Sequence, residues 1–275
     1  MARSLWRKWL SPSEHGSSTT TAAYSKQPTA ATNDTCGVGS PFTNSPRFTW
    51  KLKLQILLMS LTIAPMRAFI IGILLGLVVT IGNICCIGLV ESPADQIPPL
   101  LPDWRRRGRH LCCKLMVCCQ RVAGFRIKVY GECAPTHVAP VIVCAPHTSF
   151  WDQIAATLLR GPVCVCKEGV QYTPFLGKLF RMLQPIYVDR DSADSRQRSA
   201  QQMTNRAYAI QQTGDTLKCP HLFVFPEGTC GNATQLLQFK TGAFAPGLPI
   251  QPLIMRWPQP QGVDFVSYVF DGLGP

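Results

Sequence analysis

A histidine and an aspartate, separated by four residues, stand where an apolar run gives way to a helix-like segment. The stretch "APHTSFWD" places His147 and Asp152 directly after "PVIVCAP". A histidine whose second ring nitrogen is held by a carboxylate can act as a general base toward a hydroxyl group, because the carboxylate sets the tautomer and stabilises the imidazolium. The pair therefore predicts proton abstraction from a hydroxyl.

The spacing restricts how the two side chains can meet. On one continuous helix, positions five apart point about 140° away from each other. We therefore expect His147 to precede the helix, with Ser149 as the N-cap and Asp152 at the third helical position, which has the form of a capping box. The alternative is that Asp152 only caps the helix and His147 is an ordinary loop residue.

Two further segments have residues suited to binding an anion. In "FPEGT", Glu227 is followed by Gly228 and Thr229, and a glycine lets backbone N–H groups approach an anion closely. The strand-like "PIYVDR" ends at Arg190, a residue type suited to bidentate phosphate binding, and Lys167 after "PVCVC" is another candidate for phosphate or CoA. The alternatives are a turn for Glu227, a surface ion pair for Arg190 and a solvated charge for Lys167.

Taken together, these segments resemble the four motifs of the glycerolipid acyltransferase superfamily. H-x4-D, "PIYVDR", "FPEGT" and "GLPIQPLI" occur in the family's order, and the resemblance covers roughly Lys51 to Gly274. "QPIYVDRDSADSR" and "EGTC" look most like the lysophosphatidylcholine acyltransferases. Cys230 stands where the lysophosphatidate branch usually has Arg, whereas Asp189 before Arg190 resembles that branch, so head-group preference stays open.

The resemblance implies acyl transfer from acyl-CoA to the free hydroxyl of a lysophospholipid. His147 would take the hydroxyl proton and Asp152 would orient His147. Glu227 would hold Arg190 or its own loop, and the substrate-binding positions would be completed by Gly228, Thr229 and Lys167.

The same resemblance implies that Pro249 and Pro252 shape the acyl pocket. It requires no metal and no resident cofactor, since acyl-CoA enters as a co-substrate and leaves as CoA. Two alternatives remain. One is acylation of glycerol 3-phosphate or lysophosphatidate. The other is a non-catalytic membrane module, because the chain ends soon after the fourth motif, where family members continue.

The pattern of apolar and polar residues in the second half of the chain predicts the fold that positions these residues. "FRIKVYG" alternates apolar and polar residues, as a half-buried strand does, and "VIVCAP", "PVCVC", "PIYV", "LFVF" and "IQPLIM" read as buried strands. "SFWDQIAATLLR", "TPFLGKLFRML" and residues 194–212 read as helices. We therefore expect an α/β domain over residues 125–275, with a mixed sheet flanked by helices.

The first half predicts membrane helices. Residues 1–48 read as a disordered tail and 49–92 as a membrane-embedded segment, followed by a basic linker and amphipathic helix over 93–124. Phe69 to Val90 has no charged residue and is long enough for the roughly 20 residues of a span. We expect a break at Pro65 to Arg67, with an interfacial helix before one span or deep re-entrant helix; a hairpin is the alternative.

The charge of the chain favours a membrane as its anionic partner. Its formal net charge is +12, and no nucleic-acid-binding signature accompanies it. Arginines dense after the apolar segment predict a catalytic domain on the cytosolic face, most simply of the endoplasmic reticulum. The two cysteine doublets nearby are either buried apolar residues or palmitoylation sites: Cys112, Cys113, Cys118 and Cys119.

Overall fold

The computed structural model of the chain describes residues 40–42, 44, 48–89, 96–173, 176–189 and 193–258. Nearly all of the expected disordered tail therefore lies outside the described residues. The helices are α1 Trp50–Leu61, α2 Ile63–Cys86, α3 Asp103–Ala123, α4 Gln153–Leu158, α5 Leu176–Arg181 and α6 Ala193–Thr213, with short 3-10 helices η2 Phe150–Asp152, η3 Glu168–Tyr172 and η4 Thr241–Phe244. The strands are β1 Val141–Ala145, β2 Val163–Lys167, β3 Ile186–Val188, β4 Leu222–Val224 and β5 Ile250–Ile254.

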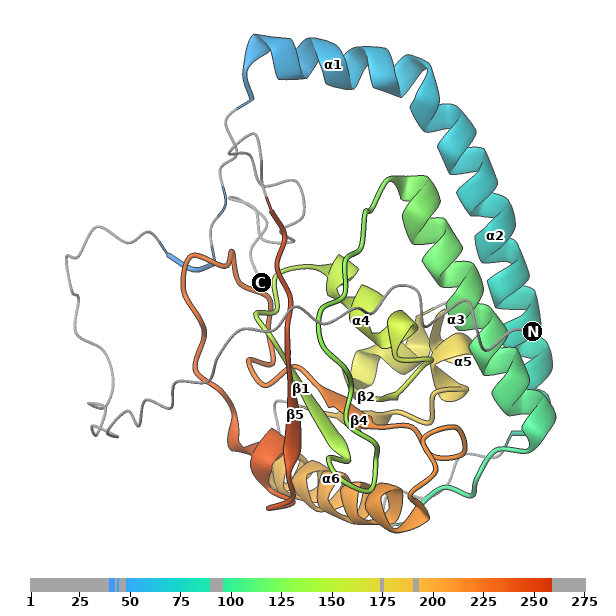
Figure 1. The fold of residues 1–275 in the computed structure, drawn as a ribbon, viewed down its shortest axis with the longest axis vertical. Coiled ribbons are helices and arrows are strands. Elements are labelled where there is room, and N and C mark those ends of the chain that lie inside the picture. The colour runs from blue at the N-terminus through green and yellow to red at the C-terminus, as the bar shows by residue number, and fades with distance from the viewer. Residues whose placement is uncertain are drawn as a thin grey trace. The chain divides into compact units, whose positions relative to one another are not determined.

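The five strands form one sheet in the order β3-β2-β4-β1-β5 (Figure 1). Every pairing among the described strands is parallel, so the α/β class is confirmed but the expectation of a mixed sheet is wrong. The reason lies in the connections. A helix or a long loop follows each of the first four strands and returns the chain to the starting edge, so neighbouring strands run the same way.

The sheet is buried on both faces. Val141 of β1 packs in one cluster with Ala207 of α6, whereas the next residue, Ile142, packs in another with Ala155 of α4. Successive side chains of a strand point to opposite faces, so a strand covered on both sides reads as a continuous apolar run. This is why "VIVCA" was recognisable as a strand without any alternation.

The predicted strand "FRIKVYG" is wrong. Residues 125–130 have no regular secondary structure, and Tyr130 is 86% exposed. Phe125 instead closes α3: its N–H donates to the carbonyl of Gln120 at 3.0 Å, and its ring packs against Trp151. The alternation of polarity here follows from one half-buried side of an irregular segment, which pairs with no described strand.

The break between the two N-terminal helices falls at Thr62 rather than at Pro65 to Arg67. Thr62 donates its N–H to Leu58 O and ends α1, and α2 begins at the next residue. Pro65 is accommodated because it lies in the first turn of α2, where a missing backbone N–H costs no helical hydrogen bond. Among the described helices, α2 is the one long and apolar enough to cross a membrane.

Helix α3 lies antiparallel to α2 along its length, as Figure 1 shows. Near the end of α2, the side chain of Cys85 lies against Gly108; near its start, the guanidinium of Arg67 lies beside Gly124, just past the end of α3. The positive charge of Arg67 is therefore placed at the negative end of the α3 dipole. Leu179 of α5 packs on the same helix pair, so α2 is joined to the α/β domain.

Candidate active site

The structure brings His147 and Asp152 together as their spacing predicted. His147 lies in the loop after β1, and its Nδ1 is 2.8 Å from Oδ2 of Asp152, the last residue of η2. The hydroxyl of Ser149 accepts the N–H of Trp151 at 3.1 Å, and the side chain of Asp152 accepts the N–H of Ser149. The expected capping box is therefore present and sets the entry to the helix.

The carboxylate of Asp152 is fully buried and fully paired. Its Oδ2 accepts the backbone N–H groups of Thr148 at 2.6 Å and Ser149 at 2.9 Å as well as the bond from His147. Its Oδ1 accepts the indole N–H of Trp257 at 2.8 Å. Helix capping and orientation of the histidine are thus not alternatives, because one carboxylate does both.

The imidazole of His147 is held by a stacking contact, and its second nitrogen faces a thiol. Its ring stacks on Phe225, with centroids 3.9 Å apart and an interplanar angle of 11°. Nε2, the nitrogen not held by Asp152, is 3.4 Å from Sγ of Cys230. The side chain of His147 retains 20% of its exposure, so a substrate approaching from solvent can reach it.

The environment favours the protonated ring. Burial lowers the pKa of His147, but hydrogen bonds and electrostatic interactions with Asp152 and Cys230 outweigh it and raise the pKa to about 9. A ring with such a pKa takes up a proton readily, which suits proton abstraction. It must also lose its resting proton before it can act as a base at neutral pH.

Glu227 holds the loop that carries His147. Its carboxylate is buried, with Oε1 accepting the backbone N–H of His147 at 2.8 Å and Oε2 that of Leu237 at 3.3 Å. In return, the N–H of Gly231 donates to the carbonyl of His147 at 2.8 Å. Of its two expected roles, Glu227 has the contacts of the loop-holding one, and Arg190 lies outside the described residues.

Gly228, in the same loop as Glu227, has a left-handed backbone conformation, which glycine adopts without strain. Gly228 has φ +70°, but its N–H is already used, donating to the carbonyl of Phe225 at 3.2 Å. Thr229 is exposed. A side chain at Gly228 would meet Lys240, whose Nζ lies 3.2 Å from the position of the added carbon, so an exposed cation covers this loop.

Of the remaining expected residues, only some lie at the edge of the sheet that carries His147. Lys167 is exposed at the carboxyl end of β2, the same edge as His147. Pro249 is exposed just before β5, whose first residue pairs with the start of β1, so it lies at the opposite edge from His147. Pro252 is exposed in β5, an edge strand that tolerates proline.

Three residues at the site were not expected as site residues: Cys230, Lys240 and Trp257. One signal for Trp257 was available, because it follows β5, and the carboxyl ends of adjacent parallel strands lie at one edge. In the sequence, Cys230 distinguishes branches of the family and carries no other signal. Nothing in its spacing from His147 indicates a contact.

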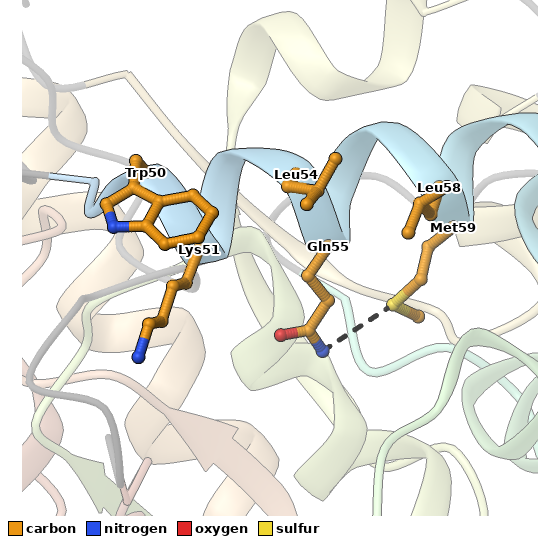
Figure 2. A pocket seen from close by; sticks show the side chains of 6 residues that line it. All are labelled: Trp50, Lys51, Leu54, Gln55, Leu58 and Met59. Carbon is orange, nitrogen blue, oxygen red and sulfur yellow. Dashed lines mark hydrogen bonds between the residues drawn. The ribbon is translucent and has the colours of Figure 1, made fainter.

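A separate hollow lies along α1 and is not part of this site. Figure 2 shows its lining, which comes from one face of a single helix: Trp50, Lys51, Leu54, Gln55, Leu58 and Met59. Neither His147 nor Asp152 contributes to it. Its apolar, open lining resembles a lipid-facing surface more than a pocket for chemistry.

Comparison with known proteins identifies the class of this site. Residues 126–256 match the family model described as Acyltransferase. That region contains every residue of the site except Trp257, and it is this region of the chain that is similar to the glycerolipid acyltransferases. The resemblance expected from the four motifs is confirmed.

Individual relatives indicate which branch of the family this chain resembles. The chain is 34% identical to lysophosphatidylcholine acyltransferase 2 of Rattus norvegicus over 239 residues, which cover 86% of this chain and 41% of that protein. It is 32% identical to lysophosphatidylcholine acyltransferase 1 of Homo sapiens, covering 86% of this chain and 42% of that protein. The chain thus spans less than half the length of either of these relatives. No solved structure matches it.

Proposed function

We propose that this chain is a membrane-bound enzyme that transfers a fatty acyl group from acyl-CoA to the free hydroxyl of a lysophospholipid. The observation that carries the proposal is an imidazole held at Nδ1 by the buried Asp152 and partly exposed to solvent, in a region that matches the acyltransferase family model. The names of the relatives support lysophosphatidylcholine as the acceptor.

In the proposed reaction, Nε2 of His147 takes the hydroxyl proton as the acceptor oxygen attacks a thioester carbonyl. Asp152 holds the ring in place and stabilises the imidazolium that forms. The proton then passes to the leaving thiolate. These steps are proton transfer and acyl transfer, so the proposal includes no metal and no prosthetic group.

Cations at the carboxyl edge of the sheet support a phosphate-bearing substrate. Lys240 covers the loop at Gly228, and Lys167 is exposed at the end of β2. We assign these two lysines to the phosphates of the acceptor or of CoA, as point charges rather than bidentate clamps. The clamp role of Arg190 stays a prediction.

The helix arrangement supports anchoring in one leaflet of the membrane rather than by a lone span. Trp50, Leu61 and Phe69 are examples of large apolar side chains left 69%, 72% and 71% exposed along α1 and α2. Yet α3, which lies beside α2, carries a run of arginines from Arg105 to Arg107, and burying these in hydrocarbon would cost several kcal/mol. We therefore assign lipid to the free side of α1 and α2, and the cytosolic headgroup region to α3.

This anchoring also brings the site close to its lipid substrate. The backbone N–H of Asn232, in the loop after Cys230, donates to the carbonyl of Pro41 at 2.8 Å. Only a short connection separates Pro41 from Trp50, the first residue of α1. The catalytic loop is therefore tied to the start of the membrane anchor, as an enzyme acting on a bilayer lipid requires.

An acceptor panel tests the proposal. The purified full chain is supplied with labelled acyl-CoA and, in separate reactions, lysophosphatidylcholine, lysophosphatidate or glycerol 3-phosphate, and labelled lipid is measured. We expect lysophosphatidylcholine to be acylated fastest. His147→Ala should reduce the rate by roughly 10²- to 10⁴-fold without unfolding the protein, because a half-buried loop base contributes little to the core.

The possible results separate the candidate functions. Preferential acylation of lysophosphatidate or glycerol 3-phosphate would replace the proposed acceptor. A folded chain that acylates none of the three would favour a non-catalytic membrane module. Near-full turnover by His147→Ala would remove the histidine from the mechanism.

A further inference from the structure

A hydrogen-bonded side chain joins the active-site loop to the segment that precedes α1. Asn232 follows Cys230 by two residues, and its Nδ2 donates to the carbonyl of Ser40, 192 positions earlier, at 3.1 Å. Its backbone N–H donates to the carbonyl of the next residue, Pro41, at 2.8 Å. In Figure 1, the blue segment before α1 accordingly meets the orange loop that follows β4. One residue thus binds two successive carbonyls of a distant segment.

The orientation of the Asn232 amide is determined by its partners. Oδ1 accepts the backbone N–H of Thr234 at 3.1 Å and the hydroxyl of Thr234 at 2.6 Å. A carbonyl can only accept and an N–H can only donate, so the amide fits these contacts in one orientation. The tripeptide "NAT" therefore forms a local turn in which the threonine holds the asparagine toward Ser40 and Pro41.

The residue between them has a strained backbone. Ala233 has φ +61°, in the left-handed region that residues other than glycine rarely adopt. Such a conformation costs free energy and persists only where surrounding contacts determine it, as is common at functional sites. The hydrogen bonds of Asn232 and Thr234 supply those contacts here. The turn is thus held in a shape that its residue types do not favour.

A displacement of Asn232 would reach His147 through one residue. The N–H of the adjacent Gly231 donates to the carbonyl of His147 at 2.8 Å, and Sγ of Cys230 lies 3.4 Å from Nε2 of the same histidine. A carbon added to Gly231 would lie 3.5 Å from the carbonyl oxygen of Pro41. The segment before α1 therefore packs directly on the residues that contact His147.

We propose that Asn232 is a positioning residue that sets the depth of His147 relative to the bilayer, because it ties the histidine loop to the start of the membrane anchor. The inference rests on the proposed function and on the proposed contact of α1 with lipid. A lysolipid in the bilayer presents its hydroxyl at a limited depth, and a loop tied to α1 keeps Nε2 at that depth. A dissolved acceptor has no such requirement, because it approaches the ring from solution.

Two physical forms of the acceptor test the proposal. The full chain is reconstituted into phosphatidylcholine vesicles with acyl-CoA. The acceptor is either long-chain lysophosphatidylcholine within the bilayer or short-chain lysophosphatidylcholine dissolved below its micelle-forming concentration. Asn232→Ala should lower kcat about tenfold with the bilayer acceptor and less than about twofold with the dissolved one, because misplacement matters most where the reacting groups cannot adjust. KM for acyl-CoA should be unchanged.

Thr234 supplies a second, milder variant and Asn205 a matched control. Thr234→Val removes the hydroxyl bond to Asn232 and should give a smaller loss with the bilayer acceptor, whereas Thr234→Ser keeps a hydroxyl and should retain the full rate. Asn205 lies on α6, and among the described residues its side chain bonds only Gln201. Asn205→Ala should therefore leave both rates unchanged. Thermal midpoints show which variants are folded.

Each outcome bears on one proposal or on both. A loss confined to the bilayer acceptor supports the positioning role of Asn232. An equal loss with both acceptors would show that Asn232 only maintains the loop, and no loss with either would show that the contact does not affect catalysis. Both of these results overturn the inference and leave the proposed acyl transfer standing. A folded wild-type chain that acylates neither acceptor would overturn the proposed function and the inference with it.

Discussion

The buried carboxylate of Asp152 connects helix capping to the proposed proton transfer. An ionised carboxylate is costly to bury unless it is paired and hydrogen-bonded, and here four donors surround it. Two of them are backbone N–H groups at the start of a helical segment, which would be unpaired without it. The same bonds hold the carboxylate still, so His147 is oriented before any substrate arrives.

The pH dependence of the reaction follows from the raised pKa of His147. Only a ring that has lost its proton can accept one, so kcat/KM should rise with pH and level off above about 9. Asp152→Asn removes one cause of the raised pKa, so the rise should move to lower pH while the plateau falls by roughly 10²- to 10⁴-fold. Initial rates between pH 6 and 10 measure both effects; an unchanged midpoint would show that another group titrates.

Trp257 is a positioning residue whose effect can be isolated with a matched control. Trp257 and Trp151 both pack against Phe125, at 5.5 and 4.8 Å between centroids, but only Trp257 donates to Asp152. A hydrogen bond to a charged group contributes about 1.5 kcal/mol or more, so Trp257→Phe should lower kcat roughly tenfold. KM for acyl-CoA should stay constant, and Trp151→Phe should change kcat less; equal effects would indicate packing alone.

The pair of helices α2 and α3 joins the proposed membrane anchor to the α/β domain. Small residues let the helices approach, since Cys85 lies against Gly108 and Leu179 of α5 lies against Gly82. Three of the four cysteines in the α3 doublets are buried, and only Cys118 is exposed. Burial makes Cys112, Cys113 and Cys119 packing residues, so palmitoylation stays a prediction for Cys118 alone.

Filling the space at Gly108 should loosen this packing. Gly108→Leu would force its side chain into Cys85, and overpacking typically destabilises a protein by about 1–3 kcal/mol. The matched control is Gly76→Leu in α2, because an added carbon at Gly76 meets nothing within 4 Å. We expect a lower thermal midpoint in detergent for Gly108→Leu alone. A similar loss in both variants would place the effect in lipid contact instead.

For the chain as a whole, one-leaflet anchoring predicts that no part of it reaches the lumen. "NDT" at Asn33 and "NAT" at Asn232 have the form of glycosylation acceptors. Both should stay unmodified, because the tail and the catalytic domain are then cytosolic. Glycosidase treatment of membranes, followed by gel mobility, measures this. A glycan on Asn33 alone would support a single span. A glycan on Asn232 would show that the domain carrying the site faces the lumen.

Resistance to salt extraction is the companion expectation. Apolar contact of α1 and α2 with lipid does not weaken in salt, whereas attraction between basic residues and anionic lipids does. The protein should therefore stay in the membrane fraction in 1 M salt, a concentration at which charges are screened beyond about 3 Å. Release by salt would show that the chain is held to the membrane by electrostatic attraction alone.

The local part of the site was predictable from the order of residues. His147, Ser149 and Asp152 lie within six residues of the chain, so their spacing alone restricts how they can meet, and the capping box agrees with it. The apolar runs likewise predicted all five strands of the sheet. The strand wrongly expected at Phe125 shows the limit, since alternating polarity describes exposure on one side and not the presence of a partner strand.

Contacts made across long separations were decided only by the tertiary structure. Cys230 meets His147 across 83 positions and Trp257 meets Asp152 across 105, and neither pair has a spacing rule. They meet because β1, β4 and β5 run parallel and adjacent, which brings the residues following their carboxyl ends to one edge. The order of residues determined which base and carboxylate pair, and the strand order of the sheet determined which thiol and indole complete the site.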